Sequence, residues 1–517
     1  MQGGFDAASS NRADSLVTAV LLLIGLVVRI GTLGLKGMSD VDAYRDWGNQ
    51  IVSKGLVEGF GGVYFPLQYQ MFAVASWLSG FGGHDVFFWL KALNAIGDIG
   101  ILLLLIRSVE RVRRNWVIGL YWLNPWFVAL SSLGYCDFQF SFFLLLFCLR
   151  LDRAADYKSS IWAGVPLAVA FLMKPQVLVV VVAVGILFAL SLLRKRPAWD
   201  ALATLVAPAV LFCCYSLYFF ARGKPLFHML WTYARTVAIM PSTTAHMMNI
   251  WYPVSIVAKP GSVDWALRND TPLLGIQMRV IGVGLMVASL SWFAYMLLRR
   301  SEELRPRRMV PLVIFGTLLL PMVMTGAHEN HLFFGTLGMC LILLREHSIP
   351  KWVWAAVVTM MGVQVVNMMA FYGLGRNALS AAAPLAALTA VWKSPILRVS
   401  VSLVDIAAFL VLMAFWAKRI VPTIRRAYMP SGILALVLVV LYGGAVLERD
   451  RLAASPALGD ASGRQVLPSP AAHPVSSAGI ALHEDALSSQ RAYLSALQCG
   501  EVVILEQGSS QCYPNSD

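Results

Sequence analysis

The chain has 517 residues, of which 58% are hydrophobic and only 13% are charged. That charged fraction is about half the usual value for soluble domains, so the composition excludes an ordinary soluble globular protein. The formal net charge is +13, but the basic residues gather in short loops between apolar segments, as at Arg111–Arg114 and Arg194–Arg196. Such loops face the cytoplasm by the positive-inside rule, so the positive charge reflects topology and argues against a role for nucleic acid.

Apolar runs of roughly 16 to 25 residues recur between Leu16 and Leu447, each near the length that crosses a bilayer as a helix. They predict an all-α polytopic membrane protein with about 13 transmembrane helices. The first run is too long for a signal peptide and lacks a small-residue cleavage site, so we expect a retained helix. With the basic loops inside, the N-terminus lies inside and the C-terminus outside, in the plasma (inner) membrane. The predicted spans are 15–35, 86–107, 116–133, 139–150, 161–173, 177–193, 199–220, 273–298, 310–325, 332–344, 352–372, 399–418 and 431–447.

Three carboxylates, Asp40, Asp42 and Asp46, lie within seven residues directly after the first predicted span. Charged groups at a membrane are rare unless they bind a ligand or take part in a reaction, so this first outer loop, residues 36–83, is a candidate site. Asp40 and Asp42 face the same way if the segment is extended and diverge by about 200° if it is helical. Residues 67–80 are expected to form a helix along the outer surface, because a further span would place the next basic loop outside.

Basic and aromatic residues are interleaved in a second outer loop, residues 221–271, where Arg235 follows Trp231 and Tyr233. Such a mixture suits a ligand with an anionic headgroup and an apolar tail. An aromatic belt with ordinary loop charges gives the same pattern, and the residues alone leave both interpretations open.

Three short polar segments interrupt the apolar runs on the predicted outer side. They are residues 134–139 around Asp137, residues Lys174–Gln176, and residues 327–331 with His328, Glu329 and His331. Each has a structural alternative, since Asp137 suits a helix N-cap, Lys174 suits a side chain that extends to the surface, and the histidines suit a membrane interface. Their convergence on one side favours a common site. The spacing of the last segment is a poor match to helical metal ligands, so we expect no metal and no other cofactor.

An enzyme acting on the outer side has no nucleotide sugar available, so a sugar donor there carries a lipid-linked phosphate as its leaving group. The reaction then requires a carboxylate that deprotonates the acceptor hydroxyl, together with cations or imidazoles that hold the phosphate. The first outer loop supplies carboxylates, and the three polar segments supply a cation and imidazoles.

The order of these segments resembles the GT-C superfamily of integral membrane glycosyltransferases over residues 15–345. The similarity is greatest to the polyprenyl-phosphate-mannose-dependent branch, which includes bacterial relatives of the GPI-anchor mannosyltransferases. The motifs that carry it are Asp40-Val41-Asp42-Ala43-Tyr44-Arg45-Asp46-Trp47, Tyr64-Phe65-Pro66-Leu67 with Tyr69, Asn124-Pro125, Leu133-Gly134-Tyr135-Cys136-Asp137, Lys174-Pro175-Gln176 and His328-Glu329-Asn330-His331. Two departures concern the substrate pocket, because the family's Trp-Gly-Gln is Leu-Gly-Tyr here and its Arg-Tyr is Asn-His.

The resemblance implies transfer of a hexose, mannose in the first instance, from a polyprenyl-phosphate donor to a lipid-linked or glycan acceptor, with inversion. It implies Asp40 as the general base and Asp42 as an assistant or the alternative base. The expected contacts to donor phosphate or sugar are Lys174, Gln176, His328, Glu329 and His331. The expected contacts to sugar or acceptor are Tyr44, Trp47, Tyr64, Asp137 and, from the second loop, Arg235.

The predicted organisation is a catalytic transmembrane module over residues 1–350, further transmembrane helices over 351–447 and an extracytoplasmic tail over 448–517. The tail begins as a linker rich in Ala, Ser, Pro and Gly. Cys499 and Cys512 flank a short strand-like stretch, and an outward-facing tail favours a disulfide between them. Two free thiols in a cytoplasmic tail are the alternative.

A lipid or glycolipid transporter is the main alternative function. It predicts ionisable residues near the middle of the bilayer in repeated halves of the chain. Five such residues lie in or at the ends of predicted spans without a repeated pattern, namely Arg29, Lys91, Asp98, Arg279 and Asp405. A ligase that moves a whole preassembled glycan would share the outer loops and differ in the size of its acceptor.

Overall fold

The computed structural model describes residues 3–35, 37–38, 40–239, 242–245, 247–258, 268–300, 305–371, 394–420, 441–442 and 444–446. The chain divides into one unit of Met1–Val446 and a second of Leu447–Asp517. The predicted linker and the Cys499–Cys512 pair lie outside the described residues, as does most of the predicted span 431–447.

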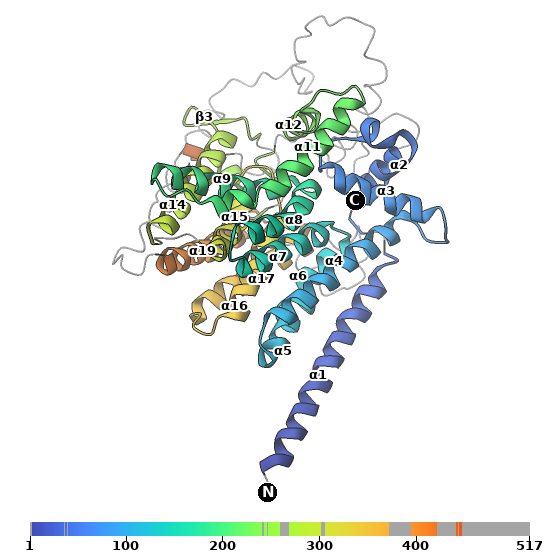
Figure 1. The fold of residues 1–517 in the computed structure, drawn as a ribbon, viewed down its shortest axis with the longest axis vertical. Helices are drawn as coiled ribbons and strands as arrows, with labels where there is room; N and C mark the ends of the chain where they lie inside the picture. Colours follow the sequence, from blue (N-terminus) through green and yellow to red (C-terminus); the bar gives the residue numbers. More distant parts are fainter. Residues whose placement is uncertain are drawn as a thin grey trace, which may run out of the picture. The chain divides into compact units, whose positions relative to one another are not determined.

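Helices make up most of the described chain (Figure 1). They are α1 (Gly3–Thr32), α2 (Asp40–Gly59), α3 (Pro66–Ser79), α4 (Val86–Ser108), α5 (Arg114–Val117), α6 (Pro125–Leu133), α7 (Asp137–Arg153), α8 (Tyr157–Met173), α9 (Leu178–Leu193), α10 (Trp199–Ala203), α11 (Val206–Ala221), α12 (His228–Ile239), α13 (Trp251–Ala258), α14 (Met278–Arg300), α15 (Val310–Val323), α16 (Phe333–Arg345), α17 (Lys351–Phe371) and α19 (Pro395–Ile420). Short 3₁₀ turns are η1 (Arg111–Arg113), η3 (Pro175–Val177), η5 (Pro306–Met309) and η6 (Glu329–Leu332), and η2 (Ile118–Trp122) is a π-helical turn.

Six helices in the described ranges are long and apolar enough to cross a membrane, or seven if one bent pair counts as a single span. This confirms the predicted all-α polytopic membrane protein, because water-soluble domains do not carry repeated apolar helices of this length. Several other predicted spans correspond to shorter helices, among them α7, α8 and α16. The count of about 13 crossings stays a prediction.

The predicted span 116–133 is broken rather than continuous. The segment Arg111–Trp122 and the helix Pro125–Leu133 meet at 48°. Pro125 has no N–H to donate and disfavours helical geometry in the residue before it, and Asn124 is indeed extended, with ψ 124°. The side-chain oxygen of Asn124 accepts a hydrogen bond from the Trp126 N–H at 3.0 Å, which caps the new helix α6.

The first outer loop folds into α2 and α3, which lie side by side (Figure 1). Their approach is close at Gly48, where an added Cβ would lie 2.5 Å from the backbone oxygen of Phe72. A side chain at position 48 would therefore push the two helices apart. The predicted surface helix 67–80 corresponds to α3, a 14-residue helix of Pro66–Ser79.

Two points of this loop, one before α2 and one before α3, are hydrogen-bonded to the ends of other helices. The backbone N–H of Met38 donates to the oxygen of Leu133 at 3.0 Å, where α6 ends. The backbone N–H of Phe65 donates to the oxygen of Met173 at 3.3 Å, where α8 ends. The first outer loop is thus fixed to two of the chain breaks that carry the predicted polar segments.

Two small sheets complete the described fold. Strand β1 (Thr244–Ala245) pairs in parallel with β4 (Ala327–His328), with Ala245 opposite His328. Strand β2 (Pro272–Leu273) pairs antiparallel with β3 (Ile276–Gln277). The first pairing fixes the second outer loop against the third predicted polar segment.

Helix α1 is tied to its neighbours by a buried ion pair between Arg29 and Asp98. The Arg29 guanidinium also lies 3.7 Å from the centroid of the Trp122 ring and donates to the Trp122 carbonyl oxygen at 2.8 Å. The Tyr121 hydroxyl donates to Asp98 Oδ1 at 2.6 Å. Charges inside a membrane protein are costly unless they are paired in this way, so Arg29 and Asp98 fasten α1 to α4 and η2.

Candidate active site

The three predicted polar segments meet at Asp137, the first residue of α7. Its Oδ1 lies 2.6 Å from Lys174 Nζ, at the end of α8, and its Oδ2 accepts a hydrogen bond from Asn330 Nδ2 of η6 at 2.8 Å. The three side chains are 0%, 2% and 4% exposed. Two side chains that lie 37 and 193 residues away from Asp137, each in a segment between helices, therefore converge on one buried carboxylate.

These contacts argue against the structural alternatives given for Asp137, a helix N-cap, and for Lys174, a side chain that extends to the surface. The N-cap of α7 is Cys136, which makes no capping hydrogen bond through its side chain, while the carboxylate of Asp137 is directed at Lys174 and Asn330. Lys174 does not extend to the surface, since its ammonium group is buried against Asp137 and lies 5.1 Å from the Phe140 ring centroid. Removing one partner of such a pair leaves an uncompensated buried charge.

A second set of contacts joins the same breaks. The Tyr135 hydroxyl donates to Glu329 Oε1, and the side-chain amide of Gln176 lies 2.6 Å from His331 Nε2. The other ring nitrogen of His331, Nδ1, accepts the backbone N–H of His328 at 3.2 Å. A neutral ring with Nδ1 as acceptor carries its proton on Nε2, so the Gln176 amide accepts that proton when it is turned to present its oxygen.

The protonation of His331 follows from its surroundings. Burial lowers the pKa of His331 well below its usual 6.5, and the positive charges of Lys174 and His328 lower it further. The ring is therefore neutral at pH 7, in agreement with its hydrogen bonds.

The aromatic side chains of the first outer loop form a second cluster, which contacts Cys136, the residue before Asp137. The hydroxyl oxygens of Tyr44 and Tyr64 are 3.0 Å apart, and the Cys136 thiol lies 4.0 Å from the Tyr44 hydroxyl. The Trp47 ring centroid is 5.9 Å from that of Tyr44 and 6.1 Å from that of Tyr64. Burial is the main cause that raises the pKa of both phenols, and it raises the pKa of the Cys136 thiol to about 11. All three groups are thus protonated at neutral pH and available as hydrogen-bond donors.

Asp40 and Asp42 lie on different sides of α2. The helix begins at Asp40, so the two carboxylates diverge by about 200°, as expected for a helical segment. Asp40 is half-buried, and its negative charge contributes to raising the pKa of Tyr44 and of Tyr64. Asp42 is 33% exposed and forms an ion pair with Arg45 at 3.3 Å. Of these two carboxylates, Asp40 is therefore the one whose charge acts on the phenols.

Arg235 lies apart from these contacts. It is an exposed residue of α12, and its charge is felt at His228. Burial lowers the pKa of His228, and Lys224 and Arg235 add to that effect. The described contacts thus connect Arg235 to the region around α12 rather than to Asp137.

Three contacts were not expected from the sequence. Asn330 and Tyr135 stand where this chain departs from the GT-C motifs, and each makes a buried contact across the same two segments. Those departures were the available signal for both residues. Gln68 of α3 donates to Gln139 of α7 at 3.2 Å in the interior, and nothing in the spacing of these two residues indicated that they meet.

Metal ligands are not grouped in the part of the chain that the structure describes, where no three His, Cys, Asp or Glu side chains are arranged to hold an ion. The polar contacts of the site are instead ion pairs and hydrogen bonds between protein groups.

No known family profile matches the chain, and no curated protein matches it. Among solved structures, the chain is similar to the crystal structure of ArnT from Cupriavidus metallidurans bound to undecaprenyl phosphate. The two are 14% identical, the match covers 85% of this chain and 78% of that one, and the TM-score is 0.39. A likeness of this degree carries no argument here, so the fold and the site rest on the geometry above.

Proposed function

We propose that the chain is a membrane glycosyltransferase that transfers a sugar from a lipid-linked phosphate donor to an acceptor hydroxyl. One observation carries the proposal. The first outer loop and the three polar segments between helices are distant in sequence. Together they bring a carboxylate, an ammonium group, imidazoles and phenols to the ends of apolar helices. Transfer of a sugar from a phosphate donor requires these groups, namely a base for the acceptor hydroxyl and hydrogen-bond donors that hold the phosphate anion.

The proposed reaction is a single displacement. The acceptor oxygen attacks the anomeric carbon, the bond from that carbon to the phosphate oxygen breaks, and the lipid phosphate leaves with the electron pair. Asp40 takes the proton of the acceptor hydroxyl. Asp40 suits this role because it lies beside Tyr44 and Tyr64, whereas Asp42 is held by Arg45.

The remaining residues are divided between those that hold the donor and those that contact the sugar or acceptor. His328, Gln176, Glu329 and His331 are proposed to hold the donor phosphate or sugar hydroxyls, with Lys174 contributing N–H groups besides the one on Asp137. Tyr44, Trp47 and Tyr64 are proposed to contact sugar or acceptor. Asp137 fixes Lys174 and Asn330 in place. Arg235 is proposed to contact the acceptor from its position on α12.

The finer assignment rests on the motif order rather than on geometry. It makes the donor a polyprenyl-phosphate hexose, with mannose as the first choice, and the acceptor a lipid-linked or glycan hydroxyl. It also places the reaction on the outer face of the plasma membrane.

The transporter alternative is less well supported by the described contacts. Two of the embedded charges, Arg29 and Asp98, pair with each other, and Lys91 donates to the Thr32 carbonyl oxygen at 3.0 Å at the end of α1. These groups stabilise helix packing, so they are poorly suited to carrying a substrate.

The experiment that tests the proposal is mass spectrometry of lipid-linked glycans from cells with and without the gene. Loss of the gene should leave an acceptor that lacks one sugar, and should let the lipid-phosphate donor accumulate. The same glycans in unchanged amounts, with full-length protein absent, would contradict a transferase.

A further inference from the structure

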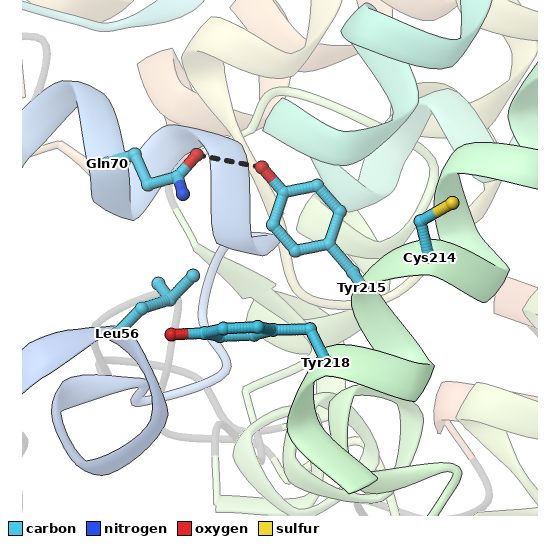
Figure 2. A pocket seen from close by; sticks show the side chains of 5 residues that line it. All are labelled: Leu56, Gln70, Cys214, Tyr215 and Tyr218. Carbon is cyan, nitrogen blue, oxygen red and sulfur yellow. Dashed lines mark hydrogen bonds between the residues drawn. The ribbon is translucent and has the colours of Figure 1, made fainter. Parts of the chain in front are cut away.

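A pocket of about 340 Å³ lies between α2, α3 and α11, away from the contacts at Asp137. Its lining residues are Leu56, Gln70, Cys214, Tyr215 and Tyr218 (Figure 2). The Tyr215 hydroxyl donates to Gln70 Oε1 at 2.7 Å and joins α11 to α3 along one wall. The volume lies at the lower end of the range for ligand pockets.

One wall of the pocket belongs to a candidate membrane span. The helix segment Trp199–Ala221 is a candidate span, and α11 forms its last part. Cys214 precedes Arg222 by eight residues, which corresponds to a depth of ~12 Å along a helix. The same helix exposes the apolar side chains Leu217 and Phe220, as expected where a helix faces lipid. An occupant at this depth must be apolar, because hydrocarbon rather than water surrounds it.

The rim of the pocket carries positive charge. The Arg222 guanidinium lies 5.7 Å from the centroid of the Tyr218 ring, directly after the candidate span. Lys224 forms an ion pair with Glu58 at 3.0 Å, and Glu58 follows the lining residue Leu56 on α2. These three charges sum to +1, so the rim complements a headgroup with one negative charge.

We propose that this pocket binds one acyl chain of a singly charged anionic phospholipid, such as phosphatidylglycerol, with its phosphate at Arg222 and Lys224. A phosphodiester carries a single charge and matches the rim, whereas the lipid phosphomonoester released in the proposed reaction carries about −1.5 to −2 at pH 7. The site is independent of the proposed reaction, since its lining residues are separate from those at Asp137. A bound lipid would hold α11 against α2 and α3 from the membrane side.

The test uses native mass spectrometry of the purified full chain, washed in detergent and offered phosphatidylglycerol. Two adjacent exposed cysteines of α11 give a matched pair, because Cys214 lines the pocket and Cys213 does not. Cys214→Trp fills the pocket and should lower retention of the lipid by about tenfold, while Cys213→Trp should retain it as the wild type does. Equal retention in both variants, or equal loss, overturns the proposal.

A second arm examines the headgroup without filling the pocket. Arg222→Gln combined with Lys224→Gln should lower retention of phosphatidylglycerol by about tenfold and leave retention of phosphatidylcholine unchanged. Wild-type protein that retains phosphatidylcholine as well as phosphatidylglycerol contradicts the charge match. Displacement of phosphatidylglycerol by a polyprenyl phosphate that is lost only in Cys214→Trp would assign the pocket to a donor lipid instead.

Discussion

Two buried ion pairs in this molecule serve different structural purposes. Arg29 lies in the last turn of α1 and pairs with Asp98 inside the regular helix α4, and the cation also stacks on Trp122. Lys174 and Asp137 meet at the ends of helices, together with Asn330 from a third chain break. The first pair fastens one helix to the side of another, so its role is complete once the helices are packed. The second pair holds the ends of three helical segments together, and imidazoles and phenols lie close to it. A reaction site requires such a grouping.

The largest expected effect comes from removing one charge of either pair. Lys174→Met leaves Asp137 buried without its cation, and Arg29→Met does the same to Asp98. Each should lower the free energy of unfolding by about 3–5 kcal/mol, because the remaining charge loses its compensation. Denaturant titration of the purified chain in detergent measures this loss.

Replacing both partners of each pair by apolar residues distinguishes the roles of the two pairs. An apolar replacement of a buried ion pair is often close to neutral for stability. The double variant Arg29→Leu, Asp98→Leu should therefore regain most of the stability and keep sugar transfer, whereas Lys174→Met, Asp137→Leu should regain stability and stay inactive. An active Lys174–Asp137 double variant would remove that pair from the reaction.

The next largest effect concerns the base. Asp40→Asn keeps the size of the side chain and removes its basicity, so turnover should fall by at least about a hundredfold while donor binding survives. Asp42→Asn should retain partial turnover, because Asp42 is occupied by Arg45 at the surface. Both are measured as sugar transfer at saturating donor. Normal activity in the first variant with none in the second would move the base to Asp42.

A matched pair of tyrosines gives a smaller effect. Tyr135→Phe and Tyr121→Phe each remove a hydroxyl that donates to a buried carboxylate, Glu329 and Asp98 respectively. Each should lower the free energy of unfolding by about 1–3 kcal/mol. Tyr135→Phe should also lower kcat/KM by about tenfold or more, since it loosens the segment that carries His328. A similar loss of kcat/KM in Tyr121→Phe would mean that both clusters act only through folding.

The smallest effect is a dependence on pH. His331 has a lowered pKa in the folded chain, whereas in the unfolded chain it titrates near 6.5. Between the two pKa values the unfolded state binds more protons, so stability rises with pH there and is lost as pH falls below 6.5. The denaturation midpoint between pH 5 and 7 should vary less in His331→Gln than in the wild type.

The sequence was sufficient to predict the membrane class and the convergence of the site. Long apolar runs have one stable form in a bilayer, and polar interruptions such as Lys174–Gln176 mark where helices end. Basic loops then indicate which interruptions share a side. From these signals alone, Asp137, Lys174 and the segment after Ala327 were expected at one place, and the structure joins them.

The individual partners were beyond such reasoning. That Asn330 binds Asp137 depends on side-chain directions over 193 residues of chain, for which spacing carries no information. The break before Pro125 was missed because apolar residues surround it on both sides. The placement of Arg235 on an exposed face of α12 depends on how the second outer loop folds, which composition does not specify.

The distances along the chain between Asp137 and its partners also set an order of assembly during synthesis. Lys174 follows Asp137 by 37 residues and Asn330 follows it by 193. At ribosomal rates of about 5–20 residues/s, the carboxylate gains its cation after roughly 2–7 s and its amide partner only after roughly 10–40 s. The early pair can hold α7 and α8 together as they enter the bilayer, while the late one awaits η6. A nascent or truncated chain that stops before residue 330 can thus form the Lys174–Asp137 pair but cannot complete the site.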